Sequence, residues 1–143
     1  MTASGKIKHA LFHRFEQELS NPVAMVLKAS SGLSVSVFDQ MTVLTLLSRQ
    51  ELAALIHITT KTIENYRSLK KKLNRPESEQ LLQLLVLYKK GEEIFGSIKE
   101  FNSWLKLSHP MLGGLVPFEL LYTTGGIQLV LEELYRIEYG AFA

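Results

Sequence analysis

Apolar side chains recur at the spacing of an α-helix along most of this chain, and the alternation typical of a β-strand is scarce. Residues 35–47 alternate at first, as a strand would, but their later apolar positions fit a helix better. Turn-forming residues interrupt the pattern at Asn21-Pro22, Ser30-Ser31-Gly32, Gly113-Gly114 and Gly125-Gly126. We therefore predict an all-α protein with helices over 7–19, 22–29, 35–47, 49–56, 60–73, 76–95, 98–108, 117–122 and 127–140.

The composition excludes several classes of protein. With 143 residues and 46% hydrophobic content, the chain suits one compact domain or two small lobes. It has no cysteine, which excludes disulfides, thiolate metal sites and a cysteine nucleophile. The longest apolar stretch, Leu81–Tyr88, is too short for a membrane span, and Met1–Lys8 lacks the apolar segment of a secretory signal. A soluble, cytoplasmic protein without membrane contact is expected.

A net charge of +2 conceals a basic block. Residues 61–75 contain six lysines and arginines against Glu64 alone, whereas residues 98–143 carry a small negative charge. A local basic block indicates that a polyanion binds at one place. The alternative is an ordinary solvated helix face.

Residues Glu51–Tyr66 have the pattern of a helix-turn-helix. Ser48 and Glu51 form a capping box that opens the first helix, and Thr60 is expected to cap the second. The tight turn between them usually begins with glycine, and here His57 takes that place; histidine tolerates a left-handed backbone better than most residues do. The alternative is an αα-hairpin within a helical bundle.

The outer face of the second helix, together with the lysines after it, is suited to DNA. Threonine, lysine and asparagine can donate hydrogen bonds to base edges or phosphates in a major groove. Basic side chains can bind phosphates. The residues expected to contact DNA are Thr60, Lys61, Glu64, Asn65, Arg67, Ser68, Lys70 and Lys71.

Other candidate sites have weaker support. His9 and His13 are four residues apart, but Lys8 and Arg14 would repel a cation, so no metal site is expected. Neither glycine pair is followed by the Lys-Ser/Thr of a phosphate loop. The glutamates of the last helix are interpreted as a solvated face. No catalytic grouping has an interpretable spacing, and we expect neither a cofactor nor an enzymatic activity.

The C-terminal lobe is expected to have a core formed by Phe101, Trp104, Leu121, Val130 and Leu134. After it, residues 135–143 are rich in aromatic side chains. This segment either packs on the protein's own core or is buried in a partner, since tyrosine and arginine often anchor interfaces.

From about residue 33 to residue 143 the sequence resembles the Xre/MbcA/ParS-type antitoxins, which are partners of RES-domain toxins. The resemblance rests on an ordered set of motifs: the helix-turn-helix Leu52–Lys70, Ser78, Phe95-Gly96, Trp104-Leu105, Leu112-Gly113-Gly114, Pro117, Leu120-Leu121, Thr123, Gly126, Val130, Leu134 and Arg136-Ile137-Glu138-Tyr139-Gly140. Two departures are visible. Lys70-Lys71-Lys72, Gln80 and Gln83 stand where the family more often has arginine, and His57 replaces the turn glycine.

The resemblance implies a non-enzymatic antitoxin that binds the operator DNA of its own operon and neutralises a RES-type toxin that destroys NAD. It also implies three segments: an N-terminal arm over 1–32, a helix-turn-helix region over 33–97 and a toxin-binding domain over 98–143. A homodimer or a hetero-oligomer with the toxin is expected. The residues expected to contact the toxin are Leu112, Gly113, Arg136, Glu138, Tyr139, Gly140 and Phe142.

We expect residues 136–143 to act as a plug for the toxin's NAD cleft, with Arg136 pairing with a carboxylate and Glu138 with a cationic lining. The alternative is a stand-alone helix-turn-helix regulator whose C-terminal lobe dimerises or senses a ligand. An enzyme is a third, disfavoured interpretation.

Overall fold

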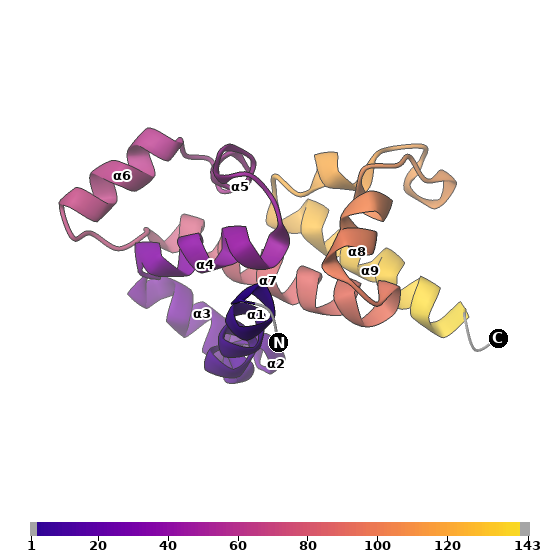
Figure 1. The fold of residues 1–143 in the computed structure, drawn as a ribbon. Coiled ribbons are helices and arrows are strands. Elements are labelled where there is room, and N and C mark those ends of the chain that lie inside the picture. The colour runs from indigo at the N-terminus through magenta and orange to yellow at the C-terminus, as the bar shows by residue number, and fades with distance from the viewer. Residues whose placement is uncertain (1–2, 141–143) are drawn as a thin grey trace. The chain divides into compact units, whose positions relative to one another are not determined.

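A computed structural model describes residues 3–140, and these residues form helices and turns without strands (Figure 1). The all-α prediction is thereby confirmed. The elements are α1 (Ala3–Arg14), α2 (Glu16–Ser20), α3 (Pro22–Ser31), α4 (Val35–Thr45), α5 (Arg49–Leu55), α6 (Thr60–Ser68), α7 (Arg75–Phe95), α8 (Ile98–Leu105), the 3-10 helices η1 (Pro110–Leu112) and η2 (Pro117–Leu120), and α9 (Thr124–Gly140).

The chain forms two compact units, Met1–Leu85 and Val86–Ala143. The first contains α1 to α6 and the beginning of α7, and the second contains the rest. The division into functional segments at residues 33 and 98 stays a prediction.

In the first unit α1 packs against α4, α2 packs against α3, and α5 and α6 pack against α4 and each other. Two long-range bonds connect its middle to its end: Leu73 N donates to Leu33 O at 2.9 Å, and Leu33 N donates to Ser78 Oγ at 3.0 Å. The core is formed by fully buried apolar side chains, among them Leu11, Phe15, Leu33, Phe38, Met41, Leu52, Leu55, Ile56 and Ile63.

The structure corrects two predictions near the N-terminus. The helix predicted over 7–19 is interrupted at Phe15, which separates α1 from α2. Ser30 and Ser31 were predicted to form a turn with Gly32, but both lie in α3. The Ser31 hydroxyl donates to Lys28 O at 2.8 Å, which satisfies the serine within the helix. Gly32, with φ +82°, then ends α3.

The start of α7 also differs from the prediction. Asn74 precedes the helix and forms a capping box with Glu77, because Glu77 N donates to Asn74 Oδ1 and Asn74 N donates to Glu77 Oε1, each at 2.9 Å. Pro76 is therefore the second helical residue rather than the first. The predicted end of the helix is confirmed, since Gly96 follows Phe95 with φ +87°.

The second unit packs α8 and α9 around η2. Phe101, Leu121, Val130 and Leu134 are fully buried, as predicted. Trp104 was also predicted to be a core residue, but it is only half-buried. Its indole lies at the edge of an aromatic cluster, 5.4 Å from the Phe95 ring and 4.6 Å from the His109 ring between centroids.

Gly125 and Gly126 were predicted to form a turn, but both lie in the first turn of α9. Thr123 caps this helix, because its Oγ1 accepts from Gly126 N at 2.9 Å. A Cβ at Gly126 would lie 1.7 Å from the carbonyl oxygen of Leu120, so the glycine permits the close approach of α9 to η2. In the described residues, no helix is both long and apolar enough to span a membrane.

Candidate functional site

The two helices of the predicted helix-turn-helix are α5 and α6. Ser48 and Glu51 form the predicted capping box: Glu51 N donates to Ser48 Oγ at 3.0 Å, and Ser48 N donates to Glu51 Oε1 at 3.1 Å. At the other end of α5, His57 N and Ile58 N donate to Ala54 O and Ala53 O, both at 3.0 Å. This is the pattern of a Schellman motif, which requires a left-handed residue. His57 is that residue, with φ +67°.

The predicted cap and the predicted end of α6 are both wrong. Thr59 rather than Thr60 caps the helix, because its Oγ1 accepts from Thr62 N at 3.1 Å. The helix was predicted to reach Leu73, but it ends at Ser68. Lys70 adopts φ +52°, and Lys71 N donates to Tyr66 O at 2.8 Å, so α6 ends in a second Schellman motif. The lysines 70–72 therefore follow the helix rather than extend it.

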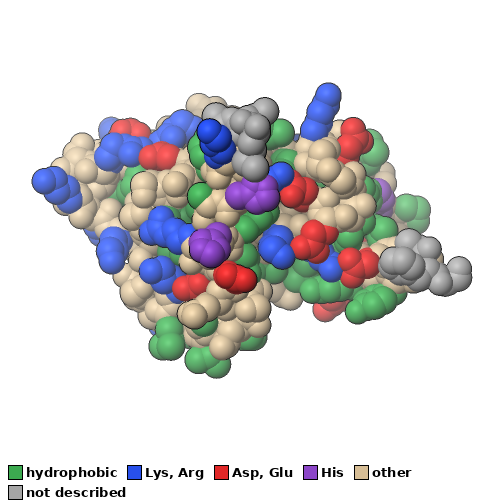
Figure 2. Space-filling view, turned by 60° about the horizontal axis from the view of Figure 1, so that its bottom comes forward, with side chains coloured by type: hydrophobic (Ala, Val, Ile, Leu, Met, Phe, Trp, Pro, Cys, Tyr) green, Lys and Arg blue, Asp and Glu red, His purple; other side chains and the backbone are tan. Residues whose placement is uncertain are grey.

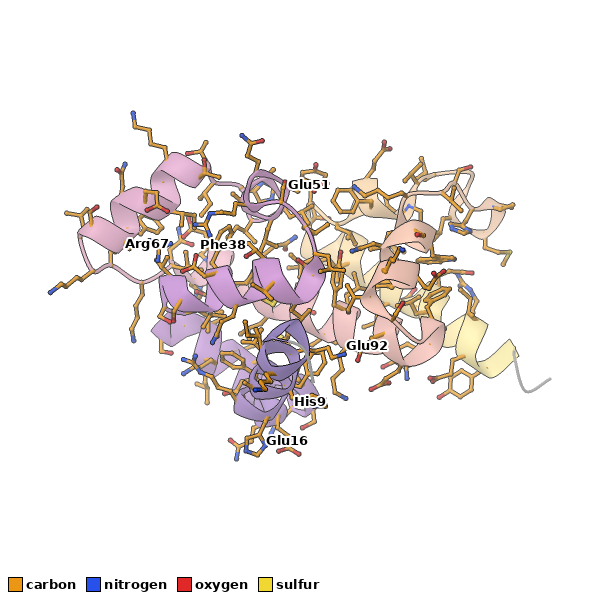
Figure 3. All side chains as sticks on the ribbon, viewed as in Figure 1. His9, Glu16, Phe38, Glu51, Arg67 and Glu92 are labelled. Atoms are coloured by element: carbon orange, nitrogen blue, oxygen red, sulfur yellow. The ribbon has the colours of Figure 1, made fainter. Side chains whose placement is uncertain are left out.

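An ion cluster that the sequence analysis missed connects α4, α5 and α6. Asp39, the only aspartate in the chain, accepts from Arg49 Nη1 at 2.8 Å and from Arg67 Nη1 at 2.9 Å. Glu64 binds the same two arginines, at 3.3 Å from Arg49 and 3.2 Å from Arg67. In Figure 3, Arg67 and Phe38 lie between α6 and α4, and the Arg49 guanidinium stacks over the Phe38 ring. We call Arg49, Asp39, Glu64 and Arg67 the clasp.

The clasp changes the chemistry of its members. Burial raises the pKa of Asp39, but hydrogen bonds from Arg67 and Arg49 outweigh burial and lower the pKa below its usual value. The hydrogen bonds that Arg67 donates to the Asp39 and Glu64 carboxylates raise the pKa of Arg67 above its usual value. Arg67 and Glu64, both predicted to contact DNA, are therefore already bound within the protein.

The remaining predicted DNA contacts lie on the outer side of α6 and just after it. Lys61, Asn65, Ser68, Lys70 and Lys71 are exposed, and Thr60 is half-buried. Figure 2 shows lysine and arginine side chains on the side of the molecule where α6 lies in Figure 1.

Tyr66 connects the base of α6 to α7. Its hydroxyl donates to Glu77 Oε2 at 3.2 Å. Burial and the Glu77 carboxylate raise the pKa of this hydroxyl. The Lys71 ammonium lies 4.7 Å above the center of the Tyr66 ring. The position of Lys71 after the helix is thus defined by an aromatic contact.

In the second unit, the predicted toxin contacts of α9 fall into two groups. Tyr139 is 70% exposed, and its ring stacks on that of Tyr135 with centroids 6.5 Å apart. Tyr135 is 40% exposed and lies one turn before Tyr139 on the same face of α9. Tyr135 and Tyr139 form what we call the α9 stripe. Gly140 is the last residue of α9, and Phe142 lies outside the described residues.

Arg136 and Glu138 bind within the protein. Arg136 Nε donates to Glu133 Oε2 at 2.8 Å, although the Arg136 side chain remains about half exposed. Glu133 is buried, so the interpretation of all glutamates of α9 as a solvated face is wrong for this residue. Glu138 accepts from Lys90 Nζ of α7 at 2.8 Å. This hydrogen bond raises the pKa of Lys90, and the Lys90 ammonium also lies 4.9 Å from the center of the Tyr135 ring.

The loop between α8 and η2 contains the other predicted toxin contacts. His109 closes it, since His109 N donates to Leu115 O at 3.1 Å and its carbonyl accepts from Gly114 N at 2.9 Å. Leu112 is half-buried in η1, and Gly113 is exposed with φ +68°. Three apolar side chains that the sequence analysis did not assign are exposed here: Leu107, Met111 and Leu115.

Most of the second unit is similar to a known protein family. Residues 90–140 match the family model described as the antitoxin Xre/MbcA/ParS C-terminal toxin-binding domain. The resemblance to the Xre/MbcA/ParS-type antitoxins is confirmed. The description of the matched family names a toxin-binding role for this segment.

A curated relative agrees with this assignment. The Prs ADP-ribosylating antitoxin of Sphingobium sp. (strain YBL2) is 30% identical over 97 residues, and the match covers 62% of this chain. The chain spans about three fifths (61%) of the length of that relative. The matched segment contains α8, α9 and the loop between them, and so every predicted toxin contact except Phe142.

Proposed function

We propose that this chain is an antitoxin whose second unit binds and neutralises a protein toxin. The observation that carries the proposal is the match of residues 90–140 to a toxin-binding domain, in which α9 exposes the α9 stripe. Exposed tyrosines on a rigid helix are suited to an interface, because they bury a large area at a low cost in conformational entropy.

The proposed toxin is an enzyme that uses NAD. The sequence resemblance implies a RES-domain toxin that destroys NAD. The relative's name refers to ADP-ribosylation, a transfer for which NAD is the usual donor of the ADP-ribose group. Both lines support a toxin with a dinucleotide cleft, and a RES-type toxin is our specific proposal.

In the proposed mechanism the end of α9 occludes that cleft. Tyr139 and Phe142 bury their aromatic rings where the bases of NAD would stack. Arg136 keeps about half of its side chain exposed and can bind a carboxylate of the toxin from its position beside Glu133. Glu138 has a different role from the one first expected: through Lys90 it holds the last turns of α9 against α7.

Co-expression with the toxin tests this mechanism. Truncation after Gly140 keeps the Lys90–Glu138 pair, and Tyr139→Ala removes one exposed ring. We expect each variant to remain folded. The double variant, which combines the truncation with Tyr139→Ala, should neither co-purify with the toxin nor preserve cellular NAD. Tyr122→Ala is the matched control, because Tyr122 is also exposed in this unit but lies outside α9.

Two outcomes would distinguish the alternatives. If the double variant fully preserved cellular NAD, the toxin contact would instead be the loop that exposes Leu107, Met111 and Leu115. If the wild-type chain fails to bind any toxin encoded beside it, the stand-alone regulator would replace the antitoxin proposal.

We also propose that the first unit binds operator DNA through α6, as an autorepressor. The exposed lysines of α6 and of the segment after it support this role. Lys61→Gln and Lys71→Gln should each weaken binding to the upstream region of the operon, and each should reduce the slope of log K against log salt by about one. Lys99→Gln, which removes an exposed lysine from α8, is the control. Equal effects of all three substitutions would indicate only a general charge effect and would reject α6 as the DNA contact.

A further inference from the structure

The outer face of α6, the proposed DNA contact, ends in an apolar side chain. Lys61, Asn65 and Leu69 lie at intervals of four residues, so they share this face, and all three are exposed. Leu69 directly follows α6, and its φ of −85° and ψ of 0° continue the helical conformation. Ile63 and Arg67, which hold α6 to the first unit, lie on the opposite side of the helix (Figure 3). A base that α6 contacts therefore meets the outer face.

The clasp limits which side chains of α6 can read a base. Arginine suits the major-groove edge of guanine, and glutamate suits that of cytosine. Glu64 and Arg67 are the residues of these types on α6, and each is bonded to two other members of the clasp. Asn65 and Leu69 stay exposed, and both suit an A·T pair. Asparagine binds adenine at N6 and N7, and the thymine 5-methyl group is the apolar group of the major groove.

We propose that Leu69 determines operator specificity by packing on the 5-methyl group of a thymine, beside an adenine bound by Asn65. A leucine side chain has neither donor nor acceptor, so this methyl group is the base-edge group that it can bind. Four helical residues span about 6 Å, and base pairs are about 3.4 Å apart, so the two bases should be one or two pairs apart. The inference rests on the proposed DNA binding and adds the bases that α6 reads.

The surroundings of Leu69 favour DNA over a membrane. The exposed lysines 70–72 directly follow Leu69, and DNA phosphates complement their charge. An anionic membrane also attracts lysines, but a helix that lies in a membrane surface needs a broad apolar face. Lys61, Asn65 and Ser68 make the rest of this face polar. A single leucine within a polar, basic surface is therefore suited to one methyl group in a groove.

Selection and base substitution test the contact. The full chain first selects its binding site from a random pool of DNA duplexes at about 100 mM salt. We expect the selected half-site to contain an adenine and a thymine one or two pairs apart. Each thymine of the site is then replaced by uracil, which lacks only the 5-methyl group. At the contacted thymine, uracil should raise the dissociation constant about fourfold, as expected for one buried methyl group.

A cycle of protein and DNA substitutions then identifies the side chain. Leu69→Ala should weaken binding to the thymine duplex at least as much as uracil does, and uracil should have no further effect on this variant. Asn65→Ala should remove the preference for adenine. Leu27→Ala is the matched control, because Leu27 is 65% exposed in the same unit but lies on α3, so it should keep the full uracil effect. Circular dichroism and the melting temperature would show that the variants remain folded.

Several results would overturn the inference. The selected site could consist of G·C pairs, or uracil could leave the dissociation constant unchanged at every thymine. Leu69→Ala could weaken binding to thymine and uracil duplexes equally, which would assign Leu69 to the DNA backbone or to the fold. Leu69→Ala could also leave DNA binding unchanged but release the chain from vesicles of anionic phospholipid, which would assign Leu69 to a membrane. Failure to select any duplex would reject the proposed DNA binding itself, and the inference with it.

Discussion

The two candidate surfaces are held in place by different forces. In the first unit α6 is connected to α4 and α5 by the clasp, and the turns around it are left-handed at residues other than glycine. In the second unit the close approach of helices depends on glycine. A Cβ at Gly91 would lie 2.3 Å from the Phe101 ring, and one at Gly126 would lie 1.7 Å from Leu120 O.

This difference affects how each surface can respond to a partner. Half-exposed ion pairs contribute little energy each and can exchange one partner for another, so a DNA phosphate can compete with Asp39 for Arg67. Close-packed helices have no such alternative, because displacing backbone from backbone loses many contacts at once. The surface around α6 is thus adjustable, whereas the α9 stripe is presented by a rigid support.

The most severe test of this comparison is Gly126→Ala. The new methyl group would overlap the Leu120 carbonyl, and a backbone atom cannot rotate away as a side chain can. We expect the free energy of unfolding, measured by urea denaturation, to fall by about 3 kcal/mol. Gly125→Ala is the matched control: it lies in the same helical turn, nothing lies within 4 Å of its added Cβ, and alanine is the better helix former.

Gly125→Ala should therefore keep or raise the free energy of unfolding, by up to about 1 kcal/mol. If the two alanine variants had equal stability, α9 would be free to shift on η2, and the description of a rigid support would be wrong.

Asp39→Asn, which removes the carboxylate that binds both arginines of the clasp, should have a smaller effect on the free energy of unfolding. The side chain of Asp39 is about one third exposed, so we expect a loss of about 1 kcal/mol at neutral pH. The folded state lowers the pKa of Asp39 below its usual 3.8. The contribution of this carboxylate is therefore complete above that value and is lost as the pH falls through the lower, folded-state pKa. Urea denaturation at pH 7 and at about pH 3 should show the wild type and the variant converging in acid.

Glu132→Gln, an exposed glutamate of α9, is the control for the loss of one negative charge. It should leave the free energy of unfolding at pH 7 nearly unchanged. Asp39→Asn should also release Arg67 from its bidentate bond and so strengthen DNA binding. Weaker DNA binding would mean that the clasp orients α6 for DNA rather than competing with it.

The sequence predicted the all-helical class, the capping box at Ser48 and the left-handed turn at His57, because these depend on local patterns. It did not predict the end of α6 at Ser68, since Lys70 adopts a conformation that glycine normally provides. It also assigned Gly125 and Gly126 to a turn, because the local signal is the same whether a glycine bends the chain or lets another segment approach.

The clasp and the Lys90–Glu138 pair were missed for a different reason. Glu64 and Arg67 are three residues apart, but the other bonded members of the clasp are 10 to 28 residues apart. Lys90 and Glu138 are 48 residues apart, so no local pattern connects these long-range pairs. That Asp39 is the only aspartate is visible in the sequence, but the sequence does not show which arginines it binds. Long-range ion pairs need the tertiary fold before their partners can be assigned.

The smallest expected effect concerns the turns of the first unit and has the opposite sign. A left-handed backbone costs a residue with a Cβ about 1–2 kcal/mol, and glycine avoids that cost but loses more entropy on folding. His57→Gly and Lys70→Gly should therefore each raise the free energy of unfolding by about 0.5–1 kcal/mol. Leu69→Gly is the matched control, because Leu69 has φ −85° and glycine relieves nothing there, so this change should destabilise the protein. Urea denaturation of the three variants distinguishes the signs. If His57→Gly destabilised the protein, the imidazole would be making a contact worth more than the strain, and the first unit would be less adjustable than its backbone indicates.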